Sequence, residues 1–315
     1  MLADVIDHLI CPVCGTGTHL AEGAVRCERG HSFDVARQGY VNMLTGSAPP
    51  GTADTAEMVA ARADFLEAGH FAPLADRLAA LCRQGLYHQS PHDPHHQGLN
   101  HQSPHDPHHQ GLNHQSRGGQ ALDSERTGVV VDAGAGTGHY LAGALGDRAV
   151  GIALDVSKHA LRRAARAHPR IGAVVADVWR PLPVRADTAD VVLNVFAPRN
   201  AAEFARILRP GGMLVVATPG PGHLRPLVDR LGLLTVDEDK ERRLEETLGG
   251  RFALAVRDEV EITLSLGHEA VRAVVGMGPS AWHTRTGDLA AKTANLPDPV
   301  QVTAAFRITG WLVQK

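Results

Sequence analysis

The sequence has few cysteines, no long apolar runs and little net charge, and each shortage excludes a class of protein. Four cysteines in 315 residues, three of them in the first 27, do not make a disulfide framework, so we expect a reducing, cytoplasmic environment. No stretch reaches the roughly 18 apolar residues of a membrane span, and the N-terminus lacks the pattern of a signal peptide. The formal net charge is −3, so any contact with nucleic acid must come from a local basic surface or from shape.

What the chain does contain divides it into four regions. Residues 1–45 hold the cysteine cluster and are predicted to bind zinc, and residues 46–86 form a helical connection. Residues 87–120 are a histidine-rich insertion, and residues 121–315 form the largest domain. A hydrophobic content of 43% is ordinary for a globular protein of this length.

Apolar residues at three- and four-residue spacing predict one or two helices over residues 54–86. The Gly69–Pro73 stretch is expected to break them, because glycine and proline supply a turn. Cys82 falls on the apolar face, which favours a place in the core over a role as a metal ligand.

The histidine-rich insertion is a repeat. The 13 residues HQSPHDPHHQGLN, His88–Asn100, recur unchanged at His101–Asn113, and a third copy begins at His114. The histidines suggest a metal site, but proline and glycine interrupt every face that could present ligands. With so few apolar residues to offset the entropy of ordering, we predict a disordered linker.

From Thr127 onward, apolar strands alternate with helical stretches, which predicts a doubly wound α/β domain with a mostly parallel sheet. Two late runs are expected to pair as an antiparallel edge, and Glu238–Thr247 is interpreted as a solvated helix or loop. The predicted strands are Val129–Ala133, Ala149–Leu154, Ala173–Ala176, Val191–Val195, Met213–Ala217, Val260–Leu266 and Val302–Val313, and the clearest helices are His159–Ala167 and Ala201–Leu208.

A glycine-rich turn follows the first of these strands. The segment runs Asp132-Ala-Gly134-Ala-Gly136-Thr137-Gly138, and His139 stands where the dinucleotide fingerprint G-x-G-x-x-G requires a third glycine. The spacing resembles motif I of class I S-adenosylmethionine methyltransferases. A Rossmann-like domain that binds a nucleotide for other chemistry is the alternative.

The two following strands end in carboxylates, as a site for S-adenosylmethionine requires. Asp155 is placed to accept hydrogen bonds from two ribose hydroxyls, and Asp177 lies where such enzymes contact the adenine. The passage Leu208-Arg-Pro-Gly-Gly-Met resembles the helix–turn–strand connection common in this class.

The cysteine cluster has the spacing of a tetrahedral zinc site. Cys11-Pro-Val-Cys14 forms one ligand pair, and Cys27 with His31 forms the second. So small a region, with few large apolar residues, gains much of its stability from the metal. Redox or core cysteines are the alternative, and His8 and His19 are weaker candidates for the fourth ligand.

A string of motifs along nearly the whole chain resembles the RlmA family. These motifs include Cys-x-x-x-His-Ser-Phe-Asp, Gly39-Tyr-Val-Asn-Met-Leu44, Phe65-Leu-x-Ala-Gly-His-Phe71, Asp155-Val-Ser-Lys158 and Thr218-Pro-Gly-Pro-x-His-Leu224. The family methylates guanine N1 in hairpin 35 of 23S rRNA. One branch acts at guanine 745, and the branch that includes tylosin-resistance enzymes acts at guanine 748.

The resemblance implies zinc ligands at Cys11, Cys14, Cys27 and His31, and cofactor contacts at Phe71, Gly136, Thr137 and His223. Phe71 stands where the family often has tyrosine, so a contact through a hydroxyl would be lost. A homodimer whose two kinds of domain line an RNA-binding cleft is also implied.

The loop after the fourth strand is where class I enzymes usually meet the target base. We expect Asn194 to accept a hydrogen bond from that base and Phe196 to stack on an extruded guanine, although Phe196 could equally be part of the core. No acidic residue lies there, so no general base is named. We expect methylation at guanine 748, with resistance to tylosin-like macrolides. The alternatives are guanine 745, a small natural-product substrate, or a non-catalytic RNA-binding protein.

Overall fold

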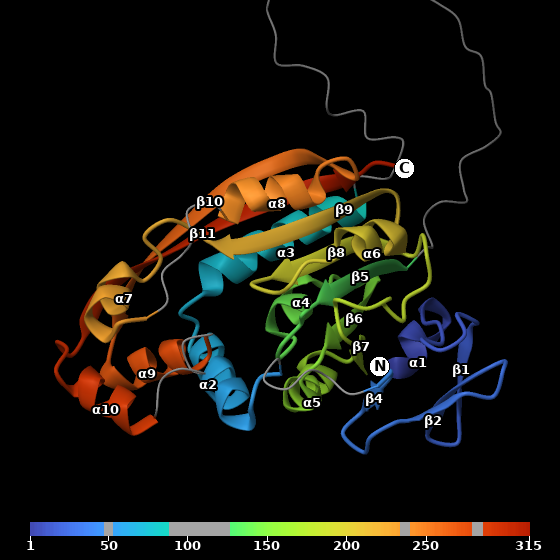
Figure 1. Ribbon diagram of the computed structural model, residues 1–315, viewed down its shortest axis with the longest axis horizontal. Coiled ribbons are helices and arrows are strands. Elements are labelled where there is room, and N and C mark those ends of the chain that lie inside the picture. Colours follow the sequence, from blue (N-terminus) through green and yellow to red (C-terminus); the bar gives the residue numbers. More distant parts are fainter. Residues whose placement is uncertain (47–52, 88–126, 234–239, 279–285) are drawn as a thin grey trace, which may run out of the picture.

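A computed structural model describes residues 1–46, 53–87, 127–233, 240–278 and 286–315 (Figure 1). The histidine-rich repeats, predicted to be disordered, lie outside these residues, as does the start of the Glu238–Thr247 segment. None of the helices in the described ranges is long and apolar enough to cross a membrane.

The N-terminal region is a small antiparallel unit. After α1 (Leu2–Val5) and the 3-10 helix η1 (Ile6–His8), the chain forms three short strands, β1, β2 and β3. Their bounds are Thr18–Ala21, Ala24–Cys27 and Ser32–Asp34.

The main sheet has the strand order β10-β11-β9-β8-β5-β6-β7-β4. Strands β4 to β9 are joined in parallel, whereas β11 runs antiparallel to both β9 and β10. The predicted parallel sheet with an antiparallel edge is therefore confirmed. The bounds are β4 Tyr40–Asn42, β5 Gly128–Ala133, β6 Ala149–Asp155, β7 Ile171–Val175, β8 Ala189–Val195, β9 Leu208–Pro219, β10 Phe252–Leu266 and β11 Val300–Val313.

Helices cover both faces of this sheet, so its central strands are buried on both sides. In β5, Val130 packs into the core under α3, α4 and α5, while Val129 and Val131 pack into the core under α1, α6 and α8. This explains why Val129, Val130 and Val131 form a continuous apolar run rather than an alternating pattern. The helices are α2 Ala56–Glu67, α3 Ala72–Tyr87, α4 His139–Ala144, α5 Lys158–Ala167, α6 Ala201–Ile207, α7 Arg225–Leu231, α8 Lys240–Leu248, α9 His268–Gly276 and α10 Thr286–Ala294.

The predicted elements differ from the observed ones mainly at their ends. The helix predicted over Ala201–Leu208 ends one residue earlier, because Leu208 already pairs with Ala189 as the first residue of β9. The late strand predicted from Val260 begins at Phe252, and a register shift lies between Leu254 and Val256. Three consecutive charged residues, Arg257, Asp258 and Glu259, interrupt the apolar pattern and made that earlier half hard to recognise. Charged residues are accommodated there because β10 is an exposed edge strand.

The segment before the repeats is built into the main domain. β4 extends the sheet beside β7, and α3 packs on β8 and β9, with Cys82 fully buried in the core as predicted. The N-terminal unit is attached through Val5, whose side chain occupies the space over Gly172, and through Leu9, which bridges to Val184. In Figure 1 this unit lies at the β4 end of the sheet, beside α5.

Candidate active site and zinc cluster

The four predicted metal ligands lie together at one end of the N-terminal unit. One ligand atom from each of Cys11, Cys14, Cys27 and His31 lies within 4.8 Å of the others. The Sγ atoms of Cys14 and Cys27 are 3.7 Å apart, and His31 Nδ1 is 3.3 Å from Cys27 Sγ and 3.6 Å from Cys11 Sγ.

These distances suit zinc. A tetrahedral ion with Zn–S bonds of about 2.3 Å separates neighbouring ligand atoms by about 3.5–3.8 Å. Burial alone would raise the pKa of Cys27, but hydrogen bonds from the Arg29 backbone and from His31 outweigh it and lower that pKa to about 6. Cys27 therefore favours the thiolate form that binds a metal, whereas burial raises the pKa of the Cys11 thiol. His8 and His19, the weaker candidates, are not part of it.

A second site is a cavity of about 390 Å³ at the carboxyl ends of the parallel strands. Parallel α/β sheets bind their ligands at this edge. Among its lining residues are six that the sequence singled out, Gly134, Gly136, Thr137, Asp155, Asp177 and Phe196.

The glycine-rich turn at residues 134–138, here called the glycine loop, closes one side of the cavity with its backbone. At Gly134, φ is +90° and a Cβ would come within 3.0 Å of the Ala197 Cβ, so no other residue fits without moving the neighbouring loop. Gly138 does not line the cavity; it begins α4 where a Cβ would press on Ala164 of α5. This close approach to α5 explains why glycine stands there, and the predicted contact of Gly138 with the cofactor stays a prediction.

Asp155 is the last residue of β6, and its carboxylate accepts a hydrogen bond from the glycine loop opposite. Oδ2 accepts a hydrogen bond from the Gly136 amide at 2.8 Å, and Oδ1 accepts one from the Ser157 amide at 2.8 Å. Burial raises the pKa of Asp155, while these two hydrogen bonds oppose the shift. Each oxygen keeps a second lone pair, as an acceptor for ribose hydroxyls requires.

Asp132 lies deeper in the same cavity, and sequence reasoning did not assign it to the site. Burial, with a contribution from the charge of Asp155, raises its pKa to about 8. Its Oδ1 atom is buried and has no hydrogen-bond partner among the residues that the structure describes. A buried polar atom facing a cavity indicates that a ligand completes the site, and S-adenosylmethionine fits this set of groups.

Asp177 lies at the far wall of the cavity. Its Oδ1 accepts a hydrogen bond from the Trp179 amide at 3.0 Å, and Arg180 lies 3.6 Å from Oδ2. Trp179, which the sequence analysis overlooked, also lines the cavity and is 66% exposed. The one feature of the sequence that could have drawn attention to Trp179 is its position two residues after Asp177.

Helix α2 covers the opening above the glycine loop. Arg62 forms an ion pair with Asp54, donates a hydrogen bond to the Met277 carbonyl at 2.8 Å, and lies over Gly136. Both Asp54 and Arg62 line the cavity. The sequence motifs assigned no role to Arg62.

Phe71 and His223 do not line the cavity. Phe71 is 2% exposed and packs edge-on against Phe65 and Phe306. The His223 ring lies 4.8 Å from that of Phe306, and its Nδ1 is 2.9 Å from the Ala305 carbonyl oxygen. Together with Phe196, whose ring is 5.6 Å from that of Phe306, they form an aromatic cluster next to the cavity. Their contact with the cofactor stays a prediction.

Asn194 and Phe196 occupy different environments although they are two residues apart. Asn194 is fully buried, and its amide donates to the carbonyls of Ala133 and Pro198, both at 2.9 Å. Phe196 is 42% exposed, lines the cavity and has φ of +53°, a strained value for phenylalanine. The structure thus holds Phe196 at the cavity instead of burying it in the core. The direct contact of Asn194 with a target base stays a prediction.

Comparison with known proteins agrees with both sites. Residues 9–46 match the family model "RlmA, N-terminal", a zinc ribbon, and residues 130–212 match a methyltransferase domain model. A Micromonospora griseorubida protein, provisionally named a 23S rRNA (guanine-N(1)-)-methyltransferase, is 48% identical over 98% of both chains. The 23S rRNA (guanine(748)-N(1))-methyltransferase of Streptomyces fradiae is 44% identical over 98% of both chains. This chain belongs to the RlmA family.

Membership identifies the fold as that of a class I methyltransferase with an N-terminal zinc ribbon. It also identifies S-adenosylmethionine as the cofactor and zinc as the metal, and the lining of the cavity and the Cys₃His cluster fit these two groups. A more distant relative from Bacillus subtilis (strain 168), also provisionally named a 23S rRNA (guanine-N(1)-)-methyltransferase, is 29% identical over 86% of both chains.

Proposed function

We propose that this protein transfers a methyl group from S-adenosylmethionine to N1 of guanine 748 in the hairpin 35 loop of 23S rRNA. The observation that carries the proposal is the match along the whole chain, ribbon and catalytic domain together, to a relative named for guanine 748. A small-molecule methyltransferase would need no zinc ribbon. Intact Asp155 and an open cavity argue against a protein that only binds RNA.

A loop nucleotide is a reasonable target for this cavity. The Watson–Crick edge of a paired guanine is occupied, whereas an unpaired base can be extruded at lower cost. Phe196 lines the cavity and is exposed, which supports its proposed role in stacking on such a base. The two hydrogen bonds of Asn194 tie the end of β5 to the loop that carries Phe196, so Asn194 acts as a positioning residue.

S-adenosylmethionine, when bound, supplies the electrophilic methyl group, and the protein supplies position. Asp155 and the glycine loop would hold the ribose end of the cofactor, and Asp177 would lie beside its base. The methyl group must then lie in line with guanine N1, so most of the rate acceleration comes from alignment. Guanine N1 loses its proton in the reaction, and we assign no general base.

The protein is also proposed to act as a homodimer in the cytoplasm, where ribosomal RNA is found, and to confer resistance to tylosin-like macrolides. The family resemblance supports the dimer, and the guanine 748 relative supports the resistance role. Light scattering of the purified protein tests the first, and drug susceptibility of an expressing host tests the second.

Primer extension on 23S rRNA tests the reaction itself. A methyl group at N1 blocks base pairing, so reverse transcriptase halts one nucleotide before the modified guanine. RNA from a host that expresses the protein should show a stop one nucleotide before guanine 748, and this stop should be absent from a host that expresses Asp155→Ala. A stop at 745 would place the protein in the other branch. No stop in hairpin 35 would refute the RNA substrate.

A further inference from the structure

Helix α5 carries an unusual concentration of positive charge. Arg162, Arg163 and Arg166, here called the α5 arginines, are all exposed, as are Lys158 and His159, and the helix contains no acidic residue. Its opposite face, Ala160, Leu161 and Ala164, is buried against the sheet. The whole protein has a net charge of −3, so this charge is local to α5.

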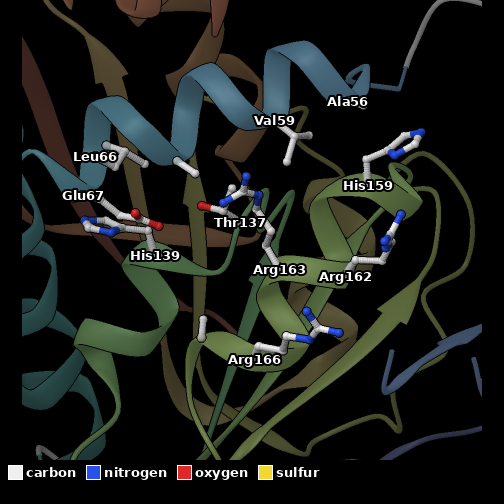
Figure 2. Close-up of a pocket in the computed structure, with 12 residues that line it drawn as sticks. Ala56, Val59, Leu66, Glu67, Thr137, His139, His159, Arg162, Arg163 and Arg166 are labelled. Carbon is white, nitrogen blue, oxygen red and sulfur yellow. The ribbon is translucent and has the colours of Figure 1, made fainter. Parts of the chain in front are cut away.

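The α5 arginines border a groove of about 560 Å³ between α5 and α2 (Figure 2). In Figure 2, Arg163 reaches toward α2 and Thr137, while Arg162 lies beside His159 on the outer flank. Leu66, Thr137 and His139 line both this groove and the cofactor cavity, so the two adjoin each other. A polymer in the groove would therefore reach the site of methyl transfer.

No acidic side chain in the described part of the chain forms a salt bridge with the α5 arginines, although other arginines such as Arg62 and Arg206 do pair. Two acidic groups lie nearby on α2: Glu67 lines the groove, and Glu57 interacts with His159. Arg162 and Arg166 are four residues apart, a spacing at which like charges destabilise a helix. An external anion would relieve this repulsion.

The position of α5 indicates which anion. In Figure 1 the helix lies between α2 on one side and the zinc ribbon on the other, and Gly39 of the ribbon region approaches Ala165 of α5. A chain of phosphates along α5 would run from the ribbon to the cofactor cavity. Arginine is well suited to phosphate because its planar guanidinium can donate two hydrogen bonds at once.

We propose that the α5 arginines bind the phosphate backbone of the rRNA hairpin that carries the target guanine. The inference rests on the proposed function, because it assigns part of the surface by which that substrate is held. Phosphate contacts fix the orientation of an RNA without reading its sequence. The α5 arginines would therefore determine affinity and placement, while the loop with Phe196 receives the base.

The test replaces all three arginines with alanine in the full-length, zinc-loaded protein. A matched control, Arg83→Ala with Arg230→Ala and Arg272→Ala, removes the same charge from exposed positions on α3, α7 and α9. Binding of a synthetic hairpin 35 RNA is measured across a salt series, and S-adenosylmethionine affinity is measured separately. A third variant with lysine at the three α5 positions keeps the charge.

The alanine variant should bind the RNA at least about tenfold more weakly, with the slope of log Kd against log salt reduced by about 1 per arginine. The control should change affinity less than threefold, the lysine variant should keep most of the slope, and S-adenosylmethionine affinity should be unchanged. Unchanged RNA affinity and slope would overturn the inference, as would a loss confined to S-adenosylmethionine binding. If the wild-type protein neither binds nor methylates the hairpin, the proposed function itself fails.

Discussion

Replacing Gly134 with alanine should push the glycine loop away from the loop that carries Ala197, because these two loops meet at the cofactor cavity. At φ of +90° a Cβ-bearing residue costs about 1–2 kcal/mol. The added methyl group would also lie within 3.0 Å of the Ala197 Cβ, an overpacking that costs about 1–3 kcal/mol. We therefore expect Gly134→Ala to lower the free energy of unfolding by about 2–5 kcal/mol and to weaken S-adenosylmethionine binding, because the loop must shift.

Two further variants make this prediction specific. Gly143 lies in α4, where an added Cβ would meet nothing within 4 Å, so Gly143→Ala should stabilise the protein by about 0.5–1 kcal/mol and leave cofactor affinity unchanged. Adding Ala197→Gly to Gly134→Ala removes the close contact but not the backbone strain, and should restore about 1–3 kcal/mol. Urea unfolding gives the free energies, and calorimetric titration gives the affinity. Wild-type stability in Gly134→Ala, or no recovery in the double variant, would refute the proposed contact.

Three other predictions concern single groups. Cys14→Ser should lower the zinc content from about one ion per chain, while Cys82→Ala should keep it, as measured by metal analysis. Full zinc occupancy in Cys14→Ser would remove Cys14 from the ligand set. Asp155→Ala should weaken S-adenosylmethionine binding by about 1.5–3 kcal/mol in a calorimetric titration, and unchanged affinity would move the ribose contact elsewhere. Burial raises the pKa of Asp132 from 3.8 to about 8, so the folded state holds a proton that the unfolded state releases, and stability falls as pH rises between these values. Asp132→Asn should therefore stabilise the protein more at pH 8 than at pH 5 in thermal unfolding, and an equal effect at both would contradict the shift.

The sequence determined the features that depend on neighbours along the chain. The parallel sheet was predictable because β5, β6 and β8 are apolar runs, each followed by a helix or a turn. The zinc cluster was predictable because its ligands come as two close pairs, which the metal then joins. Gly134, Gly136, Asp155 and Asp177 were identified because a class I site draws them from the ends of consecutive strands.

Tertiary structure decided the features that depend on contacts between distant segments. Asp132 belongs to the cavity with a pKa of about 8 only because the fold buries it beside Asp155. Phe71, Phe196, His223 and Phe306 come from four parts of the chain, and no local pattern joins them into one aromatic cluster. The charge on α5 was visible in the sequence, but its significance was not. Only the packing of α2 against α5 places those arginines along a groove that leads to the cofactor cavity, because a groove is a property of two surfaces and not of one helix.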